Sequence, residues 1–383
     1  MQNFVFYNPT KVIFGKDTIS RIGSEIARYG IKRVLLLAGG GSIKRNGVYQ
    51  QVVDSLKSNA IEWIEHWGVR PNPVLSHANE GIEIVRQNKL EGILAVGGGS
   101  VIDEAKSIAA GFFLDNLWDA FERKVKIEKA LPVFTVLTIS ATCSEMDPFA
   151  VLTNETENKK WNIEGAALYP KVSIIDPSVQ VTLPWEQTVY GAIDALSHIM
   201  EFYFQGKGEE PTLSLDETLI HNIFNSVDKL KDNPSDYSAR ATLAWSAVLA
   251  LNGFSGAGLY GGDWACHTIE HGISALHPEI AHGAGLAVVF PAWIKYIHPL
   301  NEPQFLRWAK NIFGKNNVES AVQALKEKYR SWGAPVSLRD LNISKDEIPK
   351  IIEIILQANT IRNIGNIKNL DFNDLYEILN IAY

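Results

Sequence analysis

The chain has 383 residues, of which 46% are hydrophobic and 21% are charged. This composition is typical of an ordered globular protein, and the length exceeds that of a usual single core, so two domains are expected. There are 36 basic and 43 acidic residues, which gives a formal net charge of -7. Because no stripe dense in lysine or arginine accompanies this acidic balance, we expect no nucleic-acid partner.

The N-terminal residues and the cysteines bear on the cellular location. Residues 1–7 lack a basic start followed by an apolar run, so no signal peptide is predicted. The longest apolar stretch, residues 241–251, is too short for a membrane span, which needs about 20 residues. Cys143 and Cys266 are the only cysteines. We therefore expect a cytoplasmic protein with no membrane role.

The first half of the chain alternates apolar strands with helical patterns. Residues 3–14 resemble two short strands separated by Asn8-Pro9, and an amphipathic helix is expected to end near Gly30. Further strands are predicted at residues 33–37, 61–66, 93–96, 133–137 and 172–176. Helices are predicted between the strands from 33–37 to 133–137. This alternation is typical of an α/β domain of the Rossmann-like kind, with a parallel sheet covered by helices.

Two glycine runs each follow one of these strands. They consist of Gly39, Gly40 and Gly41 with Ser42, and of Gly97, Gly98 and Gly99 with Ser100. Glycine lets a ligand approach the backbone closely, and the N-H groups and dipole of a following helix favour an anion such as a pyrophosphate. Close packing between strand and helix also selects glycine, so both interpretations are open. Neither run is a P-loop or the G-x-G-x-x-G fingerprint.

A hydroxyl-rich turn follows the strand at 133–137. Residues 138–145 read Thr138-Ile-Ser-Ala-Thr142-Cys143-Ser-Glu145, which suits hydrogen bonds to a sugar or phosphate and equally suits a capping loop. From Trp185 onward the pattern is helical, with breaks at 206–211, 233–234, 253–262 and 333–335. We therefore predict an α/β domain over 1–183 and an all-α domain over 184–383.

Four of the nine histidines lie in residues 261–285. Histidine is the commonest metal ligand and the side chain most easily poised near neutral pH. His267 and His271 are four residues apart and would share one face of a helix. His277 precedes a proline and His282 precedes a glycine, so both are expected at breaks after that helix, where they can fold back over it.

Asp194 and His198 repeat the four-residue spacing upstream. Two helices would then bring a carboxylate and imidazoles together, which predicts a metal site or an acid/base site. A mixed oxygen and imidazole shell is acceptable to Fe(II), Zn(II), Co(II) or Ni(II), and we predict a single divalent ion, Fe(II) or Zn(II), without a thiolate ligand. For any one of these histidines, a place on a solvated face or at a helix end is the alternative.

The ordered motifs resemble those of the iron-containing (group III) alcohol dehydrogenases, in particular the NADPH-dependent butanol dehydrogenase and aldehyde reductase branch, over essentially the whole chain. They are Gly68-Val-Arg-Pro-Asn72-Pro73, Gly97-Gly-Gly-Ser-Val-Ile-Asp103-Glu-Ala-Lys106, residues 138–145, Asp176-Pro177 with Thr182-Leu-Pro184, Asp194-x3-His198, and the histidine segment ending in His282-Gly283. A dehydroquinate synthase-like architecture is thereby implied.

The resemblance also implies roles for individual residues. The metal ligands would be Asp194, His198, His267 and His282, with His271 beside the metal as a catalytic proton relay. The NADP(H) contacts would be Gly39, Gly40, Gly41, Ser42, Asn72, Gly97, Gly98, Gly99, Ser100, Asp103, Thr138, Thr142, Lys160 and Val179. Two residues depart from the family pattern: Cys143 replaces a usual glycine, and Asp147 replaces a common asparagine.

The leading interpretation is an oxidoreductase that moves hydride between NADP(H) and an alcohol/aldehyde pair, with the metal as Lewis acid. A metal- and nicotinamide-dependent lyase of the dehydroquinate synthase type would use a dense basic patch, which the sequence lacks. His267-Thr-Ile-Glu270-His271 also fits the H-x-x-E-H peptidase motif, with Glu270 as general base. The peptidase alternative leaves the glycine runs unexplained. A non-catalytic scaffold protein would need neither the glycine runs nor the predicted metal ligands.

Substrate, cofactor and assembly preferences are further expectations. Phe149, Phe254, Trp264 and Ile269 either line an apolar pocket for short to medium primary alcohols and aldehydes or belong to the core. No acid lies in residues 39–45, and Lys44 or Arg45 would add positive charge, so NADPH is expected over NADH. A homodimer is also expected.

Overall fold

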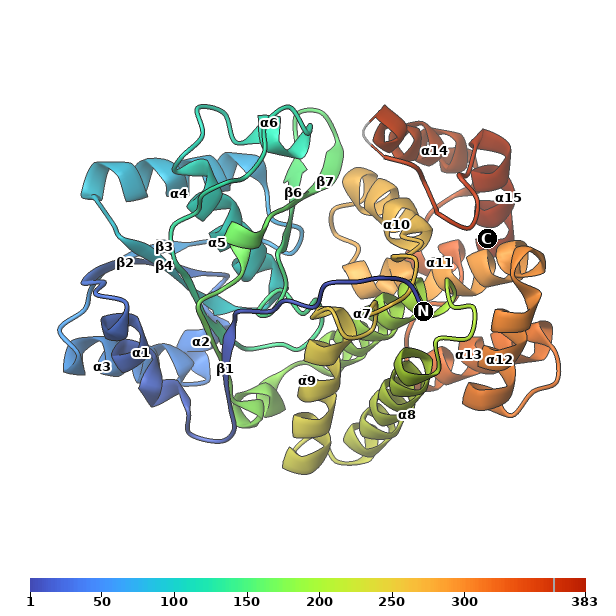
Figure 1. The fold of residues 1–383 in the computed structure, drawn as a ribbon, viewed down its shortest axis with the longest axis horizontal. Coiled ribbons are helices and arrows are strands. Elements are labelled where there is room, and N and C mark those ends of the chain that lie inside the picture. The colour runs from blue at the N-terminus through green and yellow to red at the C-terminus, as the bar shows by residue number, and fades with distance from the viewer. Residues whose placement is uncertain (361) are drawn as a thin grey trace. The chain divides into compact units, whose positions relative to one another are not determined.

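The computed structural model describes residues 1–360 and 362–383, and the chain divides into two compact units. The α/β unit comprises residues 8–183 and 235–244, and the helical unit comprises residues 1–7, 184–234 and 245–383 (Figure 1). The chain passes from one unit to the other between Leu183 and Pro184. Two short segments depart from a division of the chain into 1–183 and 184–383, namely 1–7 and 235–244.

Six parallel strands form the main sheet of the α/β unit, in the order β1-β8-β5-β4-β2-β3. Their bounds are Lys11–Phe14 (β1), Val172–Ile175 (β8), Val133–Leu137 (β5), Gly92–Gly97 (β4), Arg33–Ala38 (β2) and Glu62–Trp67 (β3). From β2 the chain continues outward to β3, and from β4 it continues in the opposite direction to β5. The topological switch point, where ligands bind in such sheets, therefore lies between β2 and β4.

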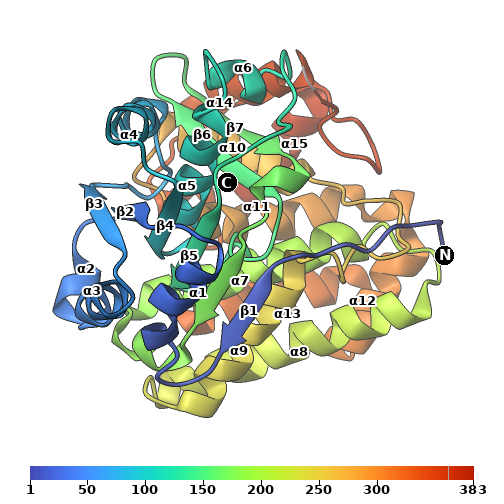
Figure 2. The same ribbon diagram turned by 60° about the vertical axis from the view of Figure 1, so that its left-hand side comes forward.

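Helices cover both faces of this sheet, as Figure 2 shows. Helices α1 (Ile22–Arg28) and α3 (Val48–Ser58) share a core with Val34, Leu36 and Ala38 of β2. The alternate β2 side chains point to the opposite face, where α4 (Leu75–Asn88) and α5 (Gly99–Gly111) pack on each other and on the strands. Burial on both faces explains why β2 and β4 are continuously apolar.

Two sequence-based expectations about strands are corrected here. Residues 3–7 form no strand, and β1 alone follows Asn8-Pro9. The sheet also has a small companion that the pattern did not predict, an antiparallel pair of β6 (Phe149–Asn154) and β7 (Lys159–Glu164). The turn at 155–158 and the strand ends beside it form a polar run, residues 153–160, that resembles a loop, so the apolar pattern that marks a strand is short on either side.

The helical unit consists of long helices joined by short loops. Their bounds are Trp185–Tyr203 (α7), Glu210–Asp232 (α8), Ala265–Leu276 (α10), His282–Ile297 (α11), Glu302–Phe313 (α12), Val318–Trp332 (α13), Ile348–Leu356 (α14) and Phe372–Ala382 (α15). Helix α9 (Tyr237–Leu251) contributes residues to both units. The expected combination of a Rossmann-like domain and a helical domain is confirmed. In residues 1–360 and 362–383, no helix is both long and apolar enough to cross a bilayer.

Helix α11, which begins at the predicted ligand His282, is a central helix of the helical unit. It packs against α7, α10, α13 and α15, and almost every side chain in it is buried. Gly283 permits the closest approach, because a Cβ atom there would lie 2.1 Å from the carbonyl oxygen of Tyr190 in α7. The start of α11 therefore rests directly on the backbone of α7.

Candidate metal and cofactor sites

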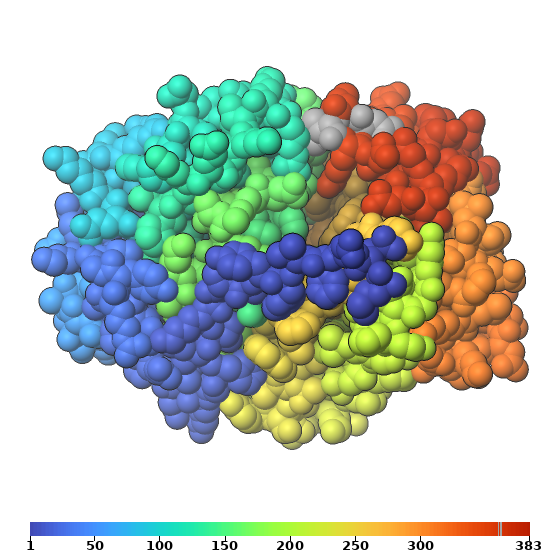
Figure 3. All heavy atoms as spheres, in the orientation of Figure 1, coloured from blue at the N-terminus to red at the C-terminus, as the bar shows by residue number. Residues whose placement is uncertain are grey.

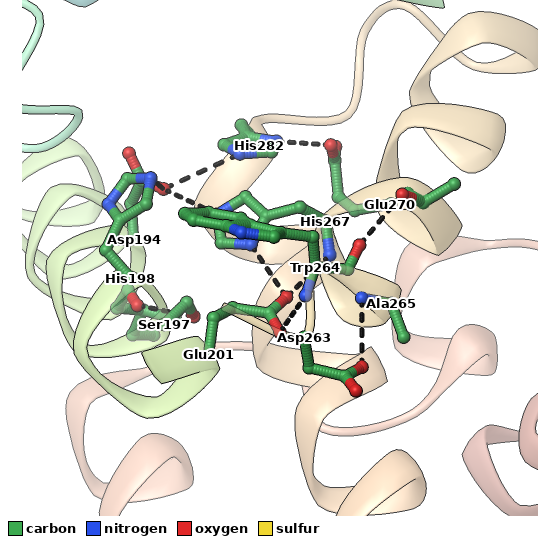
Figure 4. A network of polar contacts seen from close by, with 12 residues as sticks. Asp194, Ser197, His198, Glu201, Asp263, Trp264, Ala265, His267, Glu270 and His282 are labelled. Atoms are coloured by element: carbon green, nitrogen blue, oxygen red, sulfur yellow. Dashed lines mark hydrogen bonds and ion pairs between the residues drawn. The ribbon is translucent and has the colours of Figure 1, made fainter. Parts of the chain in front are cut away.

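Three helices bring the predicted metal ligands together, as Figure 4 shows. Asp194 and His198 lie one turn apart on α7, His267 lies on α10, and His282 is the first residue of α11. The Nε2 atoms of His198, His267 and His282 lie 3.8, 3.8 and 3.5 Å from Oδ1 of Asp194. Three imidazoles therefore converge on one carboxylate oxygen.

Two buried glutamates fix the orientation of two of these rings. Oε1 of Glu201 lies 3.0 Å from Nδ1 of His267. Oε2 of Glu270 pairs with Nδ1 of His282. With Nδ1 engaged by a carboxylate, Nε2 of each ring is the nitrogen directed to Asp194, which is how outer carboxylates position metal-binding histidines.

Neither glutamate was assigned this role from the sequence. Glu201 lies seven residues after Asp194 and three after His198, so helical periodicity places it on the ligand face of α7. That spacing was the available signal. Glu270 was considered as a peptidase base, but its carboxylate is fully buried and pairs with His282. The peptidase interpretation therefore loses its general base.

The atoms of this cluster fit a divalent cation. The ligand atoms of Asp194, His267 and His282 all lie within 4.8 Å of one another. The three distances from the Nε2 atoms to Oδ1 of Asp194, 3.5 to 3.8 Å, exceed hydrogen-bond length. They come close to the ~3.4 Å between ligand atoms that surround an ion tetrahedrally at about 2.1 Å. Among the described residues, Oδ1 of Asp194 and Nε2 of His267 are buried without a hydrogen-bond partner. Buried polar atoms rarely lack a partner, so a bound cation is the natural explanation.

Burial and neighbouring charges perturb these groups strongly. Burial alone would raise the pKa of Asp194, but His198, His282 and His267 outweigh it and lower that pKa. Burial and the two other imidazoles lower the pKa of His198 to about 3, despite the attraction of Asp194. Burial would lower the pKa of His267, yet Asp194 and Glu201 raise it to about 9. A dense cluster of perturbed groups of this kind is typical of a functional site.

The two remaining histidines of the segment occupy different positions. His271 lies one turn along α10 from His267, is 8% exposed, and its ring centre is 5.5 Å from that of His282. It is therefore beside the cluster. His277 ends α10 and pairs with Glu347 at 3.0 Å and Glu279 at 3.5 Å, away from the cluster.

Of the four residues expected in an apolar pocket, one lies at the metal site. The indole of Trp264 is centred 5.3 Å from the ring of His267 and 6.3 Å from that of His198. Ile269 is completely buried, and Phe254 packs against Phe6 at the surface with the two rings tilted. Ile269 is therefore a core residue, as the alternative interpretation held, whereas Phe254 fits neither interpretation. Phe149 begins β6 in the α/β unit.

In the α/β unit, both glycine runs lie at the switch point of the sheet. Residues 39–41 follow β2, and Gly97 to Gly99 lead from β4 into α5, whose first turn offers N-H groups. The two runs are glycine-rich for different reasons. A Cβ at Gly98 or Gly99 would lie 2.1 Å from Ile139 or 2.3 Å from Thr142, so packing requires glycine there.

At Gly40, neither packing nor the backbone conformation requires glycine. A Cβ at Gly40 would meet no atom within 4 Å, and its backbone is not left-handed. The space beside the first run is therefore open, which fits the close approach of a ligand. Gly41 adopts a left-handed φ of 93° before Ser42 begins the short helix α2 (Ser42–Arg45).

The structure explains one of the two departures from the family pattern, Asp147, and shows why glycine is usual at the other, Cys143. Cys143 has a φ of 61°, the left-handed region that glycine adopts most easily. Asp147 pairs with the fully buried ammonium of Lys106 at 2.8 Å, and Lys106 also donates to the carbonyl oxygens of Asp147 and Phe149. A buried ammonium needs such a counter-ion, so the acid is explained at this position.

The other predicted cofactor residues lie in the same unit. Thr138 follows β5, Thr142 lies against Gly99, and Ser100 is in the first turn of α5. Asp103 accepts hydrogen bonds from Ser144 at 2.5 Å and from the N-H of Val151 at 3.1 Å, which ties α5 to the hydroxyl-rich turn and β6. Three more lie elsewhere in the unit, namely Asn72 before α4, Lys160 in β7 and Val179 after β8. Their cofactor contacts stay predictions.

Comparison with known proteins decides the family. The model described as "Iron-containing alcohol dehydrogenase" matches residues 9–177, and the one described as "Fe-containing alcohol dehydrogenase family, C-terminal" matches residues 188–383. The chain belongs to the iron-containing alcohol dehydrogenase family. It is accordingly a metal-dependent alcohol dehydrogenase or aldehyde reductase, which confirms the predicted reaction class over the lyase and peptidase alternatives but leaves the choice between NADPH and NADH a prediction.

Relatives of the chain share its full length. It is 40% identical to "Probable NADH-dependent butanol dehydrogenase 2" of Bacillus subtilis, covering 99% of both chains. It is 32% identical to "NADPH-dependent aldehyde reductase YqhD" of Escherichia coli, covering 92% of both. The crystal structure of NADH-dependent butanol dehydrogenase A from Thermotoga maritima superposes with a TM-score of 0.98 at 52% identity, over 100% of this chain and 99% of that one.

Proposed function

We propose that this enzyme transfers hydride between NADP(H) and short to medium primary alcohols and aldehydes, with Asp194, His198, His267 and His282 holding one divalent ion, Fe(II) or Zn(II). The observation that carries the proposal is the convergence of three Nε2 atoms on Oδ1 of Asp194. The same chain carries two glycine runs at the switch point of a parallel sheet, where a dinucleotide would bind.

A divalent ion in this cluster would act as a Lewis acid on the substrate oxygen. The residues around it have separate tasks. Glu201 and Glu270 hold the rings of His267 and His282 with Nε2 directed inward, so the ligands need little reorganisation on binding. His271, one turn beyond His267, would hold and relay the proton that the substrate oxygen gains in reduction or loses in oxidation.

The preference for NADPH rests on residues 39–45. They contain no acid that would repel a 2′-phosphate. The ammonium of Lys44 lies 4.1 Å above the ring of Trp67 and 5.1 Å above that of Tyr49, which keeps a positive charge beside the first glycine run. The relatives differ in this respect, since those at 40% and 39% identity are named NADH-dependent and the aldehyde reductase at 32% is named NADPH-dependent.

The test compares kcat/KM for NADPH and NADH with butanal as substrate, in the parent enzyme and in Gly40→Asp. Because a side chain at Gly40 meets open space, the variant is expected to fold normally. We expect the parent to prefer NADPH by about one order of magnitude or more, since a hydrogen bond to a charged group contributes about 1.5 to 3 kcal/mol. An NADH preference in the parent, or an unchanged ratio in the variant, would contradict this assignment.

We also propose a homodimer and a cytosolic location. The N-terminal segment lies on the face drawn in Figure 3, in dark blue. Four consecutive residues of it expose apolar side chains: Phe4 (52%), Val5 (92%), Phe6 (44%) and Tyr7 (61%). Such a contiguous patch favours burial against a second copy. Light scattering of the parent and of Val5→Ser tests the dimer. Cys143 and Cys266 are buried and form no disulfide, in keeping with a reducing compartment, and cell fractionation tests the location.

A further inference from the structure

Trp264 has a backbone conformation that a bulky side chain seldom adopts. It immediately precedes α10, and its φ of 65° and ψ of 9° lie in the left-handed region. That conformation is strained for a residue other than glycine. Glycine or asparagine would make the same turn with less strain, so the turn alone does not explain tryptophan here.

The surrounding contacts hold Trp264 in this conformation. Its N-H donates to Oε2 of Glu201 at 2.7 Å, while Oε1 of the same carboxylate binds the ring of His267. The carboxylate of Asp263 accepts from the N-H groups of Ala265 and of residues 366 and 367. A Cβ at Gly262 would lie 2.4 Å from Nε1 of the indole, so glycine there leaves room for the ring.

These contacts place the indole beside the metal ligands. It packs edge to face on Phe202 with ring centres 5.2 Å apart, and it lies against His267 at 5.3 Å. Figure 4 shows it alongside the rings of His198 and His267. Both imidazoles are buried, whereas the indole is only partly buried. Part of a flat apolar surface is therefore accessible next to the atoms that would hold the ion.

We propose that Trp264 determines substrate specificity by providing a rigid apolar wall against which the alkyl group of the substrate packs. The inference rests on the proposed function. An unbranched chain lies flat on an indole, whereas a quaternary carbon next to the carbonyl is held away from it. Each buried methylene contributes about 0.8 kcal/mol, or about fourfold in kcat/KM. The wall also keeps water from the ligand side that it covers.

The test uses Trp264→Gly, because glycine adopts the left-handed conformation without strain and so preserves the turn. Trp245→Ala is the matched control, since Trp245 lies on α9 in the same unit and is 41% exposed. The measured quantity is kcat/KM with NADPH for propanal, butanal, pentanal and the branched 2,2-dimethylpropanal.

We expect kcat/KM of the parent and of Trp245→Ala to rise by about fourfold per methylene from propanal to pentanal. In Trp264→Gly the rise should fall below about twofold, and discrimination between pentanal and 2,2-dimethylpropanal should shrink by about tenfold. If Trp264→Gly keeps both the parent's rise and its discrimination, the inference is wrong. A parent that reduces none of the four aldehydes would refute the proposed function instead.

A second readout is independent of turnover. Co(II) added to metal-free protein quenches indoles close to its binding site. Trp264→Phe should therefore lose a larger share of the Co(II)-dependent quenching than Trp245→Phe, while both bind one Co(II) per chain. Equal losses in the two variants would place the indole away from the ion and overturn the inference.

Discussion

Gly283 provides a sharp test of how packing builds the proposed metal site. In Gly283→Ala the added Cβ would lie 2.1 Å from the carbonyl oxygen of Tyr190, and backbone atoms cannot move aside as a flexible side chain can. Relief to a normal contact of about 3.2 Å requires the start of α11 to move by about 1 Å. His282 is the preceding residue, and metal-ligand distances tolerate only about 0.2 Å.

The expected result is a large loss of metal affinity with a moderate loss of stability. Misplacing one of four ligands should weaken metal binding by at least about 10- to 100-fold, equivalent to about 1.4 to 2.7 kcal/mol. Overpacking should lower the free energy of unfolding of the metal-free protein by about 1 to 3 kcal/mol. The dissociation constant is measured by competition with a chelator of known affinity, and urea unfolding gives the stability.

Gly272→Ala is the control for overpacking alone. Its Cβ would lie 2.3 Å from Cγ1 of Ile355, a side chain that is able to rearrange. This variant should lose stability without a matching loss of metal affinity. If Gly283→Ala binds the metal within twofold of the parent, close contact between α11 and α7 does not position His282, and the reasoning fails.

Three further predictions concern the proton relay, the cofactor loop and the pH dependence of stability. His271→Ala should lower kcat by roughly 100-fold while retaining bound metal; loss of metal on elemental analysis would make His271 a ligand. Gly99→Ala places a Cβ 2.3 Å from Oγ1 of Thr142, so the dissociation constant for NADPH, followed by fluorescence, should rise by about tenfold or more; an unchanged constant would argue against this loop as the binding site. Burial, with the charge of Asp147, raises the pKa of Glu145 from 4.5 to about 7. Between these two pH values the native state keeps a proton on Glu145 that the unfolded chain has released. The contribution of Glu145 to stability therefore falls as the pH rises from about 4.5 to about 7. Glu145→Gln should therefore gain up to about 3 kcal/mol in unfolding free energy over the parent between pH 4.5 and pH 8, and a difference that is the same at both pH values would contradict the assignment.

Most of the fold was predictable from local sequence signals. The strands that are covered on both faces are continuously apolar, so β2, β4 and β5 are recognisable from residues 33–38, 92–97 and 133–137. The long helices are recognisable from their period and from the glycine and proline residues between them. The pair β6 and β7 was missed because residues 153–160, which form the turn and the adjoining ends of both strands, are all polar.

The candidate metal site was predictable to the level of its innermost residues. The i, i+4 spacing of Asp194 with His198 predicts a shared helix face, which the structure contains. That His198, His267 and His282 meet at one oxygen depends on the packing of α7, α10 and α11, and no local pattern encodes that packing. The requirement for glycine at position 283 could not be predicted from the sequence, because it arises from contact with the carbonyl oxygen of Tyr190 in a different helix, α7.

The supporting carboxylates show the same limit. Glu201 lies on the ligand face of α7 by simple periodicity, yet a glutamate on a helix is usually solvated, and only the structure reveals that it is buried against His267 and Trp264. The conformation of Trp264 could not be predicted either, because a tryptophan in the left-handed region runs against local preference. Sites where local rules fail in this way are often functional.

The central claim is that one divalent ion, held by Asp194 and the three imidazoles, is required for aldehyde reduction. The most direct test titrates Fe(II) or Zn(II) into metal-free protein while recording butanal-dependent oxidation of NADPH, with Asp194→Ala in parallel. We predict that activity rises from baseline, saturates at one ion per chain, and stays at baseline in Asp194→Ala. Full activity in the metal-free parent, or parent-like activity and metal content in Asp194→Ala, would contradict the claim.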